Sequence, residues 1–517
     1  MSDSEKKIQR ASLLMMASVL LSRVIGFVRE WVLAQTVGAS AMTDVYSASF
    51  TIPDFINSLM AAGALSISFV PLLTSYLTKK DQAFADRVFR SIAGTLGGFL
   101  LAFVILCEVF ALPLSRLVAP GFSPAQLEML ATLLRIILPA QLFFYWGGLA
   151  IALQYAHGHF LFPALAPLIY NSGIIIFGVA LHRSLGVMGF SIGVLAGCIF
   201  SHGVLQAWGI RRLGYRLMPS WDLSPEIRHE IARYLWLTLP IMMGFSLVVA
   251  DEWFSKYFAS SMGTRAVSWL HYARIEMRIP VAVIGQAAGI ASFPFLARLW
   301  AEGSTEQYTR TLLREVQKLW AAAPLAAIFF YTHALPITHF IFGGSKLNTL
   351  DMENTAQALR MFSVGIFFWT LQLILSRGFY ACQRTWLPSI IGTLISFVCL
   401  PLYWYLGDKM GFSGLALAGS VGIALYCLVL WVLLRGHLRR HVPNYDLQTF
   451  YGFCALWTLF LGFMALAAQQ LGRLQIYQGT QTSAFLSLVA VLTVLIGVSL
   501  LALRTVFARL TDGQPLY

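Results

Sequence analysis

The sequence is poor in charged residues. Only 11% of its 517 residues are Asp, Glu, Lys or Arg, whereas a soluble globular chain carries about 25%. A soluble chain of this length would also form two or more domains joined by polar linkers, which are missing here. The 23 acidic residues are scattered along the chain, and the loops predicted below to lie on the outer side of a membrane are short. Clustered carboxylates or a metal site in a large loop, as expected of a membrane glycosyltransferase or phosphatase, are therefore absent.

Cysteines, metal-site motifs and nucleotide-binding motifs are also scarce. No C-x-x-C is present, and His157 and His159 have no partner at i,i+4, so we expect no metal site. No G-x-x-x-x-G-K-[ST] is present, so we expect no cofactor and no ATP hydrolysis. Coupling to the membrane potential or to a monovalent cation is the expected energy source. The cysteines occur singly in apolar segments, as small core hydrophobes do: Cys107, Cys198, Cys382, Cys399, Cys427 and Cys454.

Long apolar runs fill the chain instead. Hydrophobic residues make up 58% of the sequence and the mean hydropathy is +0.71. Runs of about 20 residues can cross the bilayer core as helices. The pattern predicts an all-α polytopic membrane protein with about 14 transmembrane helices, the second and eighth bent by prolines. The predicted spans are 12–36, 44–77, 91–112, 129–156, 161–182, 187–209, 231–258, 266–297, 319–342, 356–380, 386–407, 412–435, 448–471 and 483–507.

The basic residues of the loops alternate between the two sides of this arrangement. Lys and Arg concentrate in every second loop, as the positive-inside rule predicts for cytoplasmic loops. The N-terminal run is interrupted by Arg23 and Arg29 and is read as a retained first helix rather than a signal peptide. We therefore predict both termini in the cytoplasm, and the formal charge of +13 indicates topology rather than nucleic-acid binding. The opposite side carries only Arg116, Arg183, Arg265, Lys346, Lys409 and Arg473.

The two halves of the chain resemble each other. Tyr155, Ala156 and Pro163 recur 225 positions later as Tyr380, Ala381 and Pro388. Helices 1–6 and 7–12 are therefore predicted to be duplicated lobes with the same orientation, an architecture typical of transporters. The predicted organisation is an N-lobe at 1–212, a cytoplasmic linker at 213–230, a C-lobe at 231–440, and two added helices with a C-terminal tail at 441–517.

Several charges fall inside predicted helices, where they are costly unless they face protein or water. Arg274 and Arg278 are four residues apart and share a helix face, whereas Arg23 and Arg29 are about 240° apart around an ideal helix. Buried arginines on helices 1 and 8 suit a phosphate or diphosphate, whose oxygens match the guanidinium fork. The alternative is structural ion pairing, which we favour for Arg135, Arg360 and Glu108. Nearby acids are Glu30, Asp44, Asp251, Glu252 and Glu276.

A family resemblance rests on motifs spread along nearly the whole chain. The most specific is the run from Ser22 to Arg29 (SRVIGFVR), followed by Thr43-Asp44, Ile52-Pro53, 63–66 (GALS) and 69–71 (FVP). Later motifs are 119–122 (APGF), 162–167 (FPALAP) with Asn171, Ser268-Trp269 with Tyr272-Ala273, and 378–381 (GFYA). The chain resembles the MurJ (MviN) family of lipid II flippases. The resemblance implies the fold of the multidrug/oligosaccharidyl-lipid/polysaccharide exporter superfamily, with two six-helix lobes around a central cavity and a lipid-tail groove formed by the last two helices.

The resemblance also assigns roles to residues. It implies that Arg23 and Arg29 bind the substrate diphosphate and that Asp44 is an essential acid. The sequence departs from the family pattern at two places. In the second helix, Asn57 (or Ser58) and Ala62 stand where family members have a basic residue and a Glu. The eighth helix reads YARIEMR over 272–278, whereas the family usually has Tyr-Ala-Asp-Arg at its start. Two explanations are open: Arg274 or Arg278 replaces the basic residue missing from the second helix, or the site binds another lipid-linked sugar. Asp44, Asn57 and Glu276 are expected to line or gate the cavity.

The function that these observations predict is transport without catalysis. A flippase would move undecaprenyl-diphosphate-linked lipid II from the cytoplasmic to the outer leaflet by alternating access. The alternative is a flippase for an O-antigen or exopolysaccharide precursor. The expected setting is the bacterial inner membrane, with a monomer contacting the lipid-linked saccharide and membrane lipids, no nucleic acid, and the cell-wall synthesis machinery as a further partner.

Overall fold

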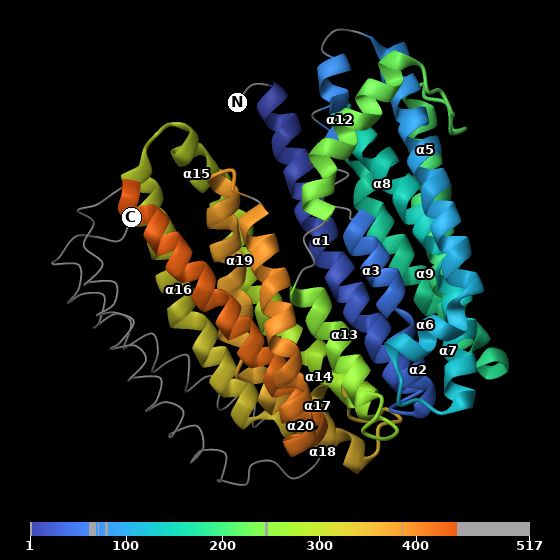
Figure 1. The fold of residues 1–517 in the computed structure, drawn as a ribbon, viewed down its shortest axis with the longest axis vertical. Helices are drawn as coiled ribbons and strands as arrows, with labels where there is room; N and C mark the ends of the chain where they lie inside the picture. Colours follow the sequence, from blue (N-terminus) through green and yellow to red (C-terminus); the bar gives the residue numbers. More distant parts are fainter. Residues whose placement is uncertain are drawn as a thin grey trace. The chain divides into compact units, whose positions relative to one another are not determined.

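The described elements are all helical. A computed structural model of the chain describes residues 3–60, 69–70, 72–77, 81–242, 247–384 and 386–441 (Figure 1). Within these ranges there is no strand, which confirms the all-α prediction. Five described helices are long and apolar enough to cross a membrane, or up to seven if each bent pair is one span. The molecule is thus a multi-pass membrane protein. The predicted spans at 448–471 and 483–507 lie outside the described residues.

The chain packs as two units, residues 1–265 and 266–517, each of which is described by itself. In the first unit the helices are α1 (Asp3–Thr36), α2 (Ala41–Ser49), α3 (Thr51–Met60), α5 (Gln82–Val109), α6 (Ala111–Val118), α7 (Pro124–Ile137), α8 (Ala140–Ala156), α9 (Leu161–Leu185), α10 (Met188–Cys198), η1 (Ile199–Val204), α11 (Leu205–Arg212), α12 (Pro225–Met242) and α13 (Leu247–Ala259). In the second unit they are α14 (Ala266–Pro280), η2 (Val281–Gln286), α15 (Ala287–Ala301), α16 (Thr305–Thr332), α17 (Ala334–Phe342), α18 (Thr349–Ser363), α19 (Ile366–Ala381) and α20 (Trp386–His441).

The seventh predicted span packs with the first unit. Its two pieces are α12, which packs on α5 and α3, and α13, which packs on α3 and α6. The boundary between the packed units therefore falls between Arg265 and Ala266, downstream of the predicted linker at 213–230. The division into duplicated lobes rests on the sequence repeat and stays a prediction.

Several helix breaks fall where proline or glycine requires them. Pro53 has no N–H to donate to the carbonyl group four residues earlier, and α2 ends just before it, with Phe50 as its C-cap. Pro280 ends α14, and the chain continues as the π-helix η2. The long helix α20 is two helices that meet at Gly411, which has φ 61° and ψ −146°. The predicted spans 386–407 and 412–435 lie on either side of this glycine.

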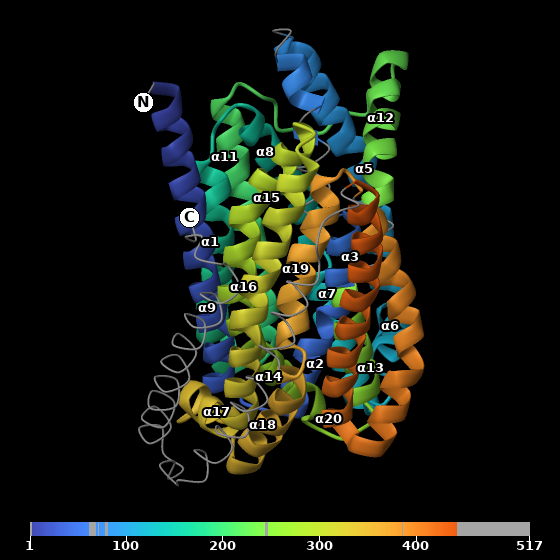
Figure 2. The same ribbon diagram turned by 90° about the vertical axis from the view of Figure 1, so that its left-hand side faces the viewer.

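In the second unit, long helices lie side by side. The helix α16 packs along both α15 and α19, as Figure 2 shows. It is followed by α17 after a bend of 80°, and α18 is followed by α19 after a bend of 44°. Asn348 begins α18 with a capping box in which its side chain and that of Asp351 each accept a backbone N–H from the other residue. The shorter helices α17 and α18 pack against each other and against α16 and α14, respectively.

Three glycines bring α9 and α10 into backbone contact. A Cβ at Gly173 would lie 2.6 Å from Gly197 Cα, and one at Gly193 would lie 2.8 Å from Ile174 Cα. A Cβ at Gly197 would lie 2.6 Å from the carbonyl oxygen of Tyr170. Small residues at helix contacts allow the backbones to approach closely, which is how helices associate in membranes. We call this contact the glycine seam. It fixes the position of α9, which packs along α1 (Figure 1).

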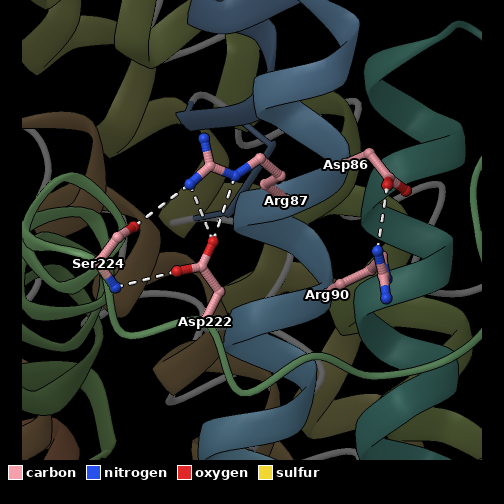
Figure 3. A network of polar contacts seen from close by, with 5 residues as sticks. All are labelled: Asp86, Arg87, Arg90, Asp222 and Ser224. Carbon is pink, nitrogen blue, oxygen red and sulfur yellow. Dashed lines mark hydrogen bonds and ion pairs between the residues drawn. The ribbon is translucent and has the colours of Figure 1, made fainter.

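The segment 213–224 lies along α5. The guanidinium of Arg87 donates to Asp222 Oδ2 from Nη2 at 2.9 Å and from Nε at 3.2 Å (Figure 3). The backbone N–H of Ser224 donates to the other carboxylate oxygen of Asp222 at 2.9 Å. Further along α5, Arg90 donates from Nε to the carbonyl oxygen of Met218 and its own carbonyl oxygen accepts the N–H of Ser220. The predicted linker is therefore fastened to a helix of the first unit through much of its length.

Candidate functional site

Arg29 is held between α1 and α9. Its Nη1 donates to Asn171 Oδ1 at 3.0 Å, and its Nε donates to Glu30 Oε1 at 3.1 Å. Nη2 also contacts Glu30, which forms an ion pair with Arg29. Asn171 is oriented in turn by donating from Nδ2 to the carbonyl oxygen of Pro167 at 2.9 Å. A guanidinium has five N–H donors, so three are used here and two remain for a ligand.

The Arg29–Glu30 pair changes the charge available to a substrate. The side chains of Arg29 and Glu30 are only 26% and 12% exposed, so their interaction is screened less than that of a surface pair. With its charge balanced by Glu30, Arg29 contributes directed N–H donors rather than a free positive charge. Anion binding there would rely on hydrogen-bond geometry.

Arg23 lies six residues earlier on the same helix and is exposed. The helix α1 runs without a break through Gly26, so Arg23 and Arg29 remain about 240° apart around the axis. A Cβ at Gly26 would lie 3.9 Å from Asn171 Oδ1. The two arginines thus project from different sides of α1. Arg29 lies in the contact with α9, and Arg23 lies on an exposed side of the helix.

Asp44 is fully buried at the start of α2. Its Oδ2 accepts the backbone N–H of Arg265 at 2.6 Å. Arg265 has a φ of 78°, a left-handed conformation that is uncommon outside glycine. A charge-assisted hydrogen bond to a buried carboxylate can hold such a turn. Asp44 therefore fastens the last residue of the first unit.

A further loop that was predicted to face outward meets this turn. Ser260 Oγ accepts the backbone N–H of Gly121 at 3.1 Å, and a Cβ at Gly121 would lie 2.4 Å from Ser261 Cα. The loop before α2 is closed by Ser40, which caps Thr43, and by Thr43 Oγ1, which donates to the carbonyl oxygen of Gly38. These loops and the turn were predicted to lie on the same side of the membrane, and the contacts of Gly121 and Asp44 with the turn agree with that topology.

The eighth-helix residues lie in the second unit, on α14. Arg274 is buried, with its Cζ 4.7 Å from the ring centroid of Phe362 on α18, a cation–π contact. Arg278 is exposed, so one turn separates a buried from an exposed arginine. Glu276 is fully buried, and its Oε2 accepts a hydrogen bond from Thr338 Oγ1 on α17 at 3.1 Å.

The predicted site residues thus fall into two groups. Arg23, Arg29, Asp44 and Asn57 belong to the first unit, where Asn57 is half-buried on α3. Arg274, Glu276 and Arg278 belong to the second unit. Their convergence on one diphosphate stays a prediction. The partners Asn171 and Thr338 were not predicted as site residues, although Asn171 stood in a recognised motif. Nothing in the sequence marked Thr338.

The described residues also bear on the predictions about metals and cysteines. They contain no group of three or more His, Cys, Asp or Glu residues placed to hold a metal. His157 has a structural role, because its Nδ1 donates to the carbonyl oxygen of Leu153 at 3.0 Å and its Nε2 lies 3.4 Å from Tyr215 Oη. The cysteines within the described ranges are all buried thiols, as predicted; Cys454 lies outside them. Arg135, predicted to be structural, donates from Nε to the carbonyl oxygen of Glu108 at 3.2 Å.

Comparison with known proteins decides the family. The family model described as lipid II flippase MurJ matches residues 33–508. The chain belongs to the MurJ family. It is similar to the "Lipid II flippase MurJ" of Burkholderia cenocepacia, with 30% identity over 443 residues, 82% of this chain and 83% of that protein. It is 26% identical to the "Probable lipid II flippase MurJ" of Vibrio cholerae, over 84% of this chain and 85% of that one.

Solved structures agree on the fold. The structure titled "Lipid II flippase MurJ, inward closed conformation" matches with a TM-score of 0.78 and 20% identity, over 96% of this chain and all of that one. An inward-facing multidrug resistance MATE transporter of the MOP superfamily matches with a TM-score of 0.67 and 15% identity, over 84% of this chain and 99% of that one. The family and its MATE neighbours therefore share a transporter fold, as the motifs implied.

Proposed function

We propose that this chain is a flippase that moves lipid II from the cytoplasmic to the outer leaflet of the bacterial inner membrane. The family match over residues 33–508 carries the proposal. The matched relatives are named lipid II flippases and a solved structure of the same fold is a transporter, which supports a transporter rather than an enzyme.

Arg29 is the residue on which we place the diphosphate contact in the first unit. Asn171 and Glu30 hold its guanidinium in one orientation and leave two N–H donors unused. Unused guanidinium N–H donors suit the oxygens of a phosphate group. Arg23, Arg274 and Arg278 supply further positive charge in the proposed cycle, in which the two lobes rock and the head group leaves outward while the lipid tail stays in the bilayer.

The membrane potential favours this direction of movement. An inside-negative potential assists outward movement of an anion by about 2.3 kcal/mol per charge per 100 mV. We propose that the potential or a monovalent cation gradient drives the cycle, and that the chain works without a bound cofactor. In this proposal both termini lie in the cytoplasm, and the chain crosses the membrane 14 times, as two six-helix lobes and two added helices. The protein acts as a monomer together with the cell-wall synthesis machinery.

The alternative substrate, another polyprenyl-linked saccharide, is less well supported. Relatives covering more than four fifths of the chain carry the name lipid II flippase. The fold alone does not separate substrates, because a MATE transporter shares it. The altered eighth helix is therefore best explained as a different way of supplying charge for the same diphosphate.

Complementation tests the substrate directly. A bacterial strain depleted of its essential lipid II flippase would receive this gene, and accumulation of cytoplasmic-facing lipid II would be measured. We expect growth to be rescued and accumulation to fall. Failure of rescue, with the protein expressed and inserted in the membrane, would point to another polyprenyl-linked glycan.

Paired variants separate the ligand-binding role of Arg29 from a purely structural ion pair. Breaking a buried pair at one partner leaves an unpaired charge, whereas neutralising both partners is much less costly. Arg29→Gln and Glu30→Gln would be compared with the double variant and with Arg310→Gln, an exposed residue paired with Glu306 on α16. If Arg29 binds the diphosphate, the double variant stays inactive although its thermal stability recovers. Recovery of transport with stability would assign the pair a structural role only.

A further inference from the structure

Glu276 is a carboxyl group that the proposed transport mechanism leaves without a task. It is fully buried on α14. Its Oε2 accepts the hydroxyl of Thr338 at 3.1 Å, while its Oε1 is buried and has no hydrogen-bond partner among the described residues. A buried carboxylate with one neutral donor and no counter-ion would carry a large desolvation cost. A protonated carboxyl group avoids the part of this cost that comes from burying a charge.

Among the described residues, no charged group on the neighbouring elements forms an ion pair with Glu276. Arg274, on the same helix, stacks over Phe362 instead, and Arg278 is exposed. The helix η2 contains no titratable residue, and on α20 the exposed Asp408 and Lys409 form their own ion pair. The charged residues of α16 all precede Leu319, in its first half. On α17 and α18 the remaining groups are His333, His339, Asp351, Glu353 and Arg360, none of which forms an ion pair with Glu276 in the described residues.

The local backbone makes this part of α14 adaptable. Pro280 lacks the N–H that would donate to the carbonyl oxygen of Glu276, and the helix changes to a π-helix directly afterwards. Such π-helical segments often mark functional sites in helices. One turn earlier, the ring of Tyr272 packs against that of Phe342 on α17 at 5.0 Å. The α14–α17 contact therefore combines a fixed aromatic pair with a weaker Glu276–Thr338 contact beside a helix irregularity.

We propose that Glu276 is a proton-carrying site, neutral in the conformation described here and able to release its proton to water when α14 and α17 separate during the transport cycle. Only the O–H bond breaks and re-forms, and water is both acceptor and donor. A proton fits better than a metal cation, because Glu276 and Thr338 together supply fewer oxygen ligands than a cation requires. The coupling of this proton to substrate movement rests on the proposed function, whereas the protonation of Glu276 does not.

Infrared spectroscopy of the full-length protein in lipid nanodiscs tests the protonation without any substrate. A neutral carboxylic acid has a carbonyl band that a carboxylate lacks. We expect this band at neutral pH in the wild type, lost in Glu276→Gln and shifted in Thr338→Val. The matched control is Asp351→Asn, because Asp351 is equally buried but accepts hydrogen bonds from Trp269 Nε1 at 2.9 Å and from the Asn348 backbone. A wild-type band that is missing, or that survives in Glu276→Gln, would overturn the proposal.

Transport in proteoliposomes then tests the coupling. The wild-type rate of lipid II movement is expected to respond to an imposed pH gradient, and Glu276→Gln, which mimics the neutral acid, is expected to lose that response. A Glu276→Gln protein with an unchanged response would overturn the coupling role. If the wild type moves no lipid II, the proposed function fails, and the infrared band still decides whether Glu276 holds a proton. If Glu276→Gln does not fold, the shift of the band in Thr338→Val decides the same point.

Discussion

Replacing Gly197 by alanine is expected to force the glycine seam apart. The new methyl group would lie 2.6 Å from the carbonyl oxygen of Tyr170, whereas ordinary contacts begin at 3.4 Å. Overpacking of this kind costs about 1–3 kcal/mol, and the upper end applies because the atom met is backbone and cannot rotate away. Alanine in a helix gains about 1 kcal/mol over glycine. We therefore expect a net loss of about 2 kcal/mol.

A matched control separates the two effects. Gly436 lies in α20, and a Cβ there would meet no atom within 4 Å, so Gly436→Ala gains helix propensity without a clash. In thermal unfolding of the purified protein in detergent, Gly197→Ala should melt below the wild type and Gly436→Ala at or above it. Gly197→Ala should also reduce transport, because Tyr170 precedes Asn171, which positions Arg29. A Gly197→Ala protein as stable as the wild type would refute the argument from close backbone contact.

Two further predictions concern the carboxylates that fasten loops. Asp44→Ala removes the acceptor for the part-buried Arg265 N–H and should cost about 1–3 kcal/mol, seen as faster hydrogen exchange of that amide. In Asp44→Asn, which keeps an acceptor, the amide should exchange more slowly than in the alanine variant, and equal rates would contradict the assignment. The pKa of Asp222 is lowered to about 2 by hydrogen bonds from the Ser224 backbone and Arg87. The stability that the Asp222 carboxylate contributes is therefore present above its ordinary pKa of 3.8 and is lost as the pH falls toward 2. Protease protection of residues 213–224 should fall in that window for the wild type, whereas Asp222→Asn should be weakly protected at every pH.

Much of the architecture could be predicted because local chemistry determines it. Pro53 and Pro280 remove backbone donors, so the helix breaks beside them were visible in the sequence. Gly411 separates two spans that had been predicted from hydropathy alone. The cysteines of the described residues are buried as their apolar settings indicated.

The contacts of the candidate site were harder to predict because they depend on distant partners. Arg29 contacts Asn171, 142 positions away, and a single sequence does not pair two such residues. Adjacent residues point about 100° apart on a helix, so the Arg29–Glu30 pair depends on side-chain length rather than on helix periodicity. One partner of Asp44 is a backbone amide, which any residue type at position 265 except proline could supply. Glu276 was visible as an intramembrane acid, but the absence of a counter-ion for it among the described residues was not.

The fastening of residues 213–224 to α5 determines how the chain could be divided into fragments. A gene split at the repeat boundary, after residue 212, would separate α12 and α13 from α3, α5 and α6, on which they pack. A split after Arg265 would keep every one of those helix contacts within a single polypeptide. Two co-expressed fragments, 1–265 and 266–517, should therefore reassemble more readily than fragments 1–212 and 213–517.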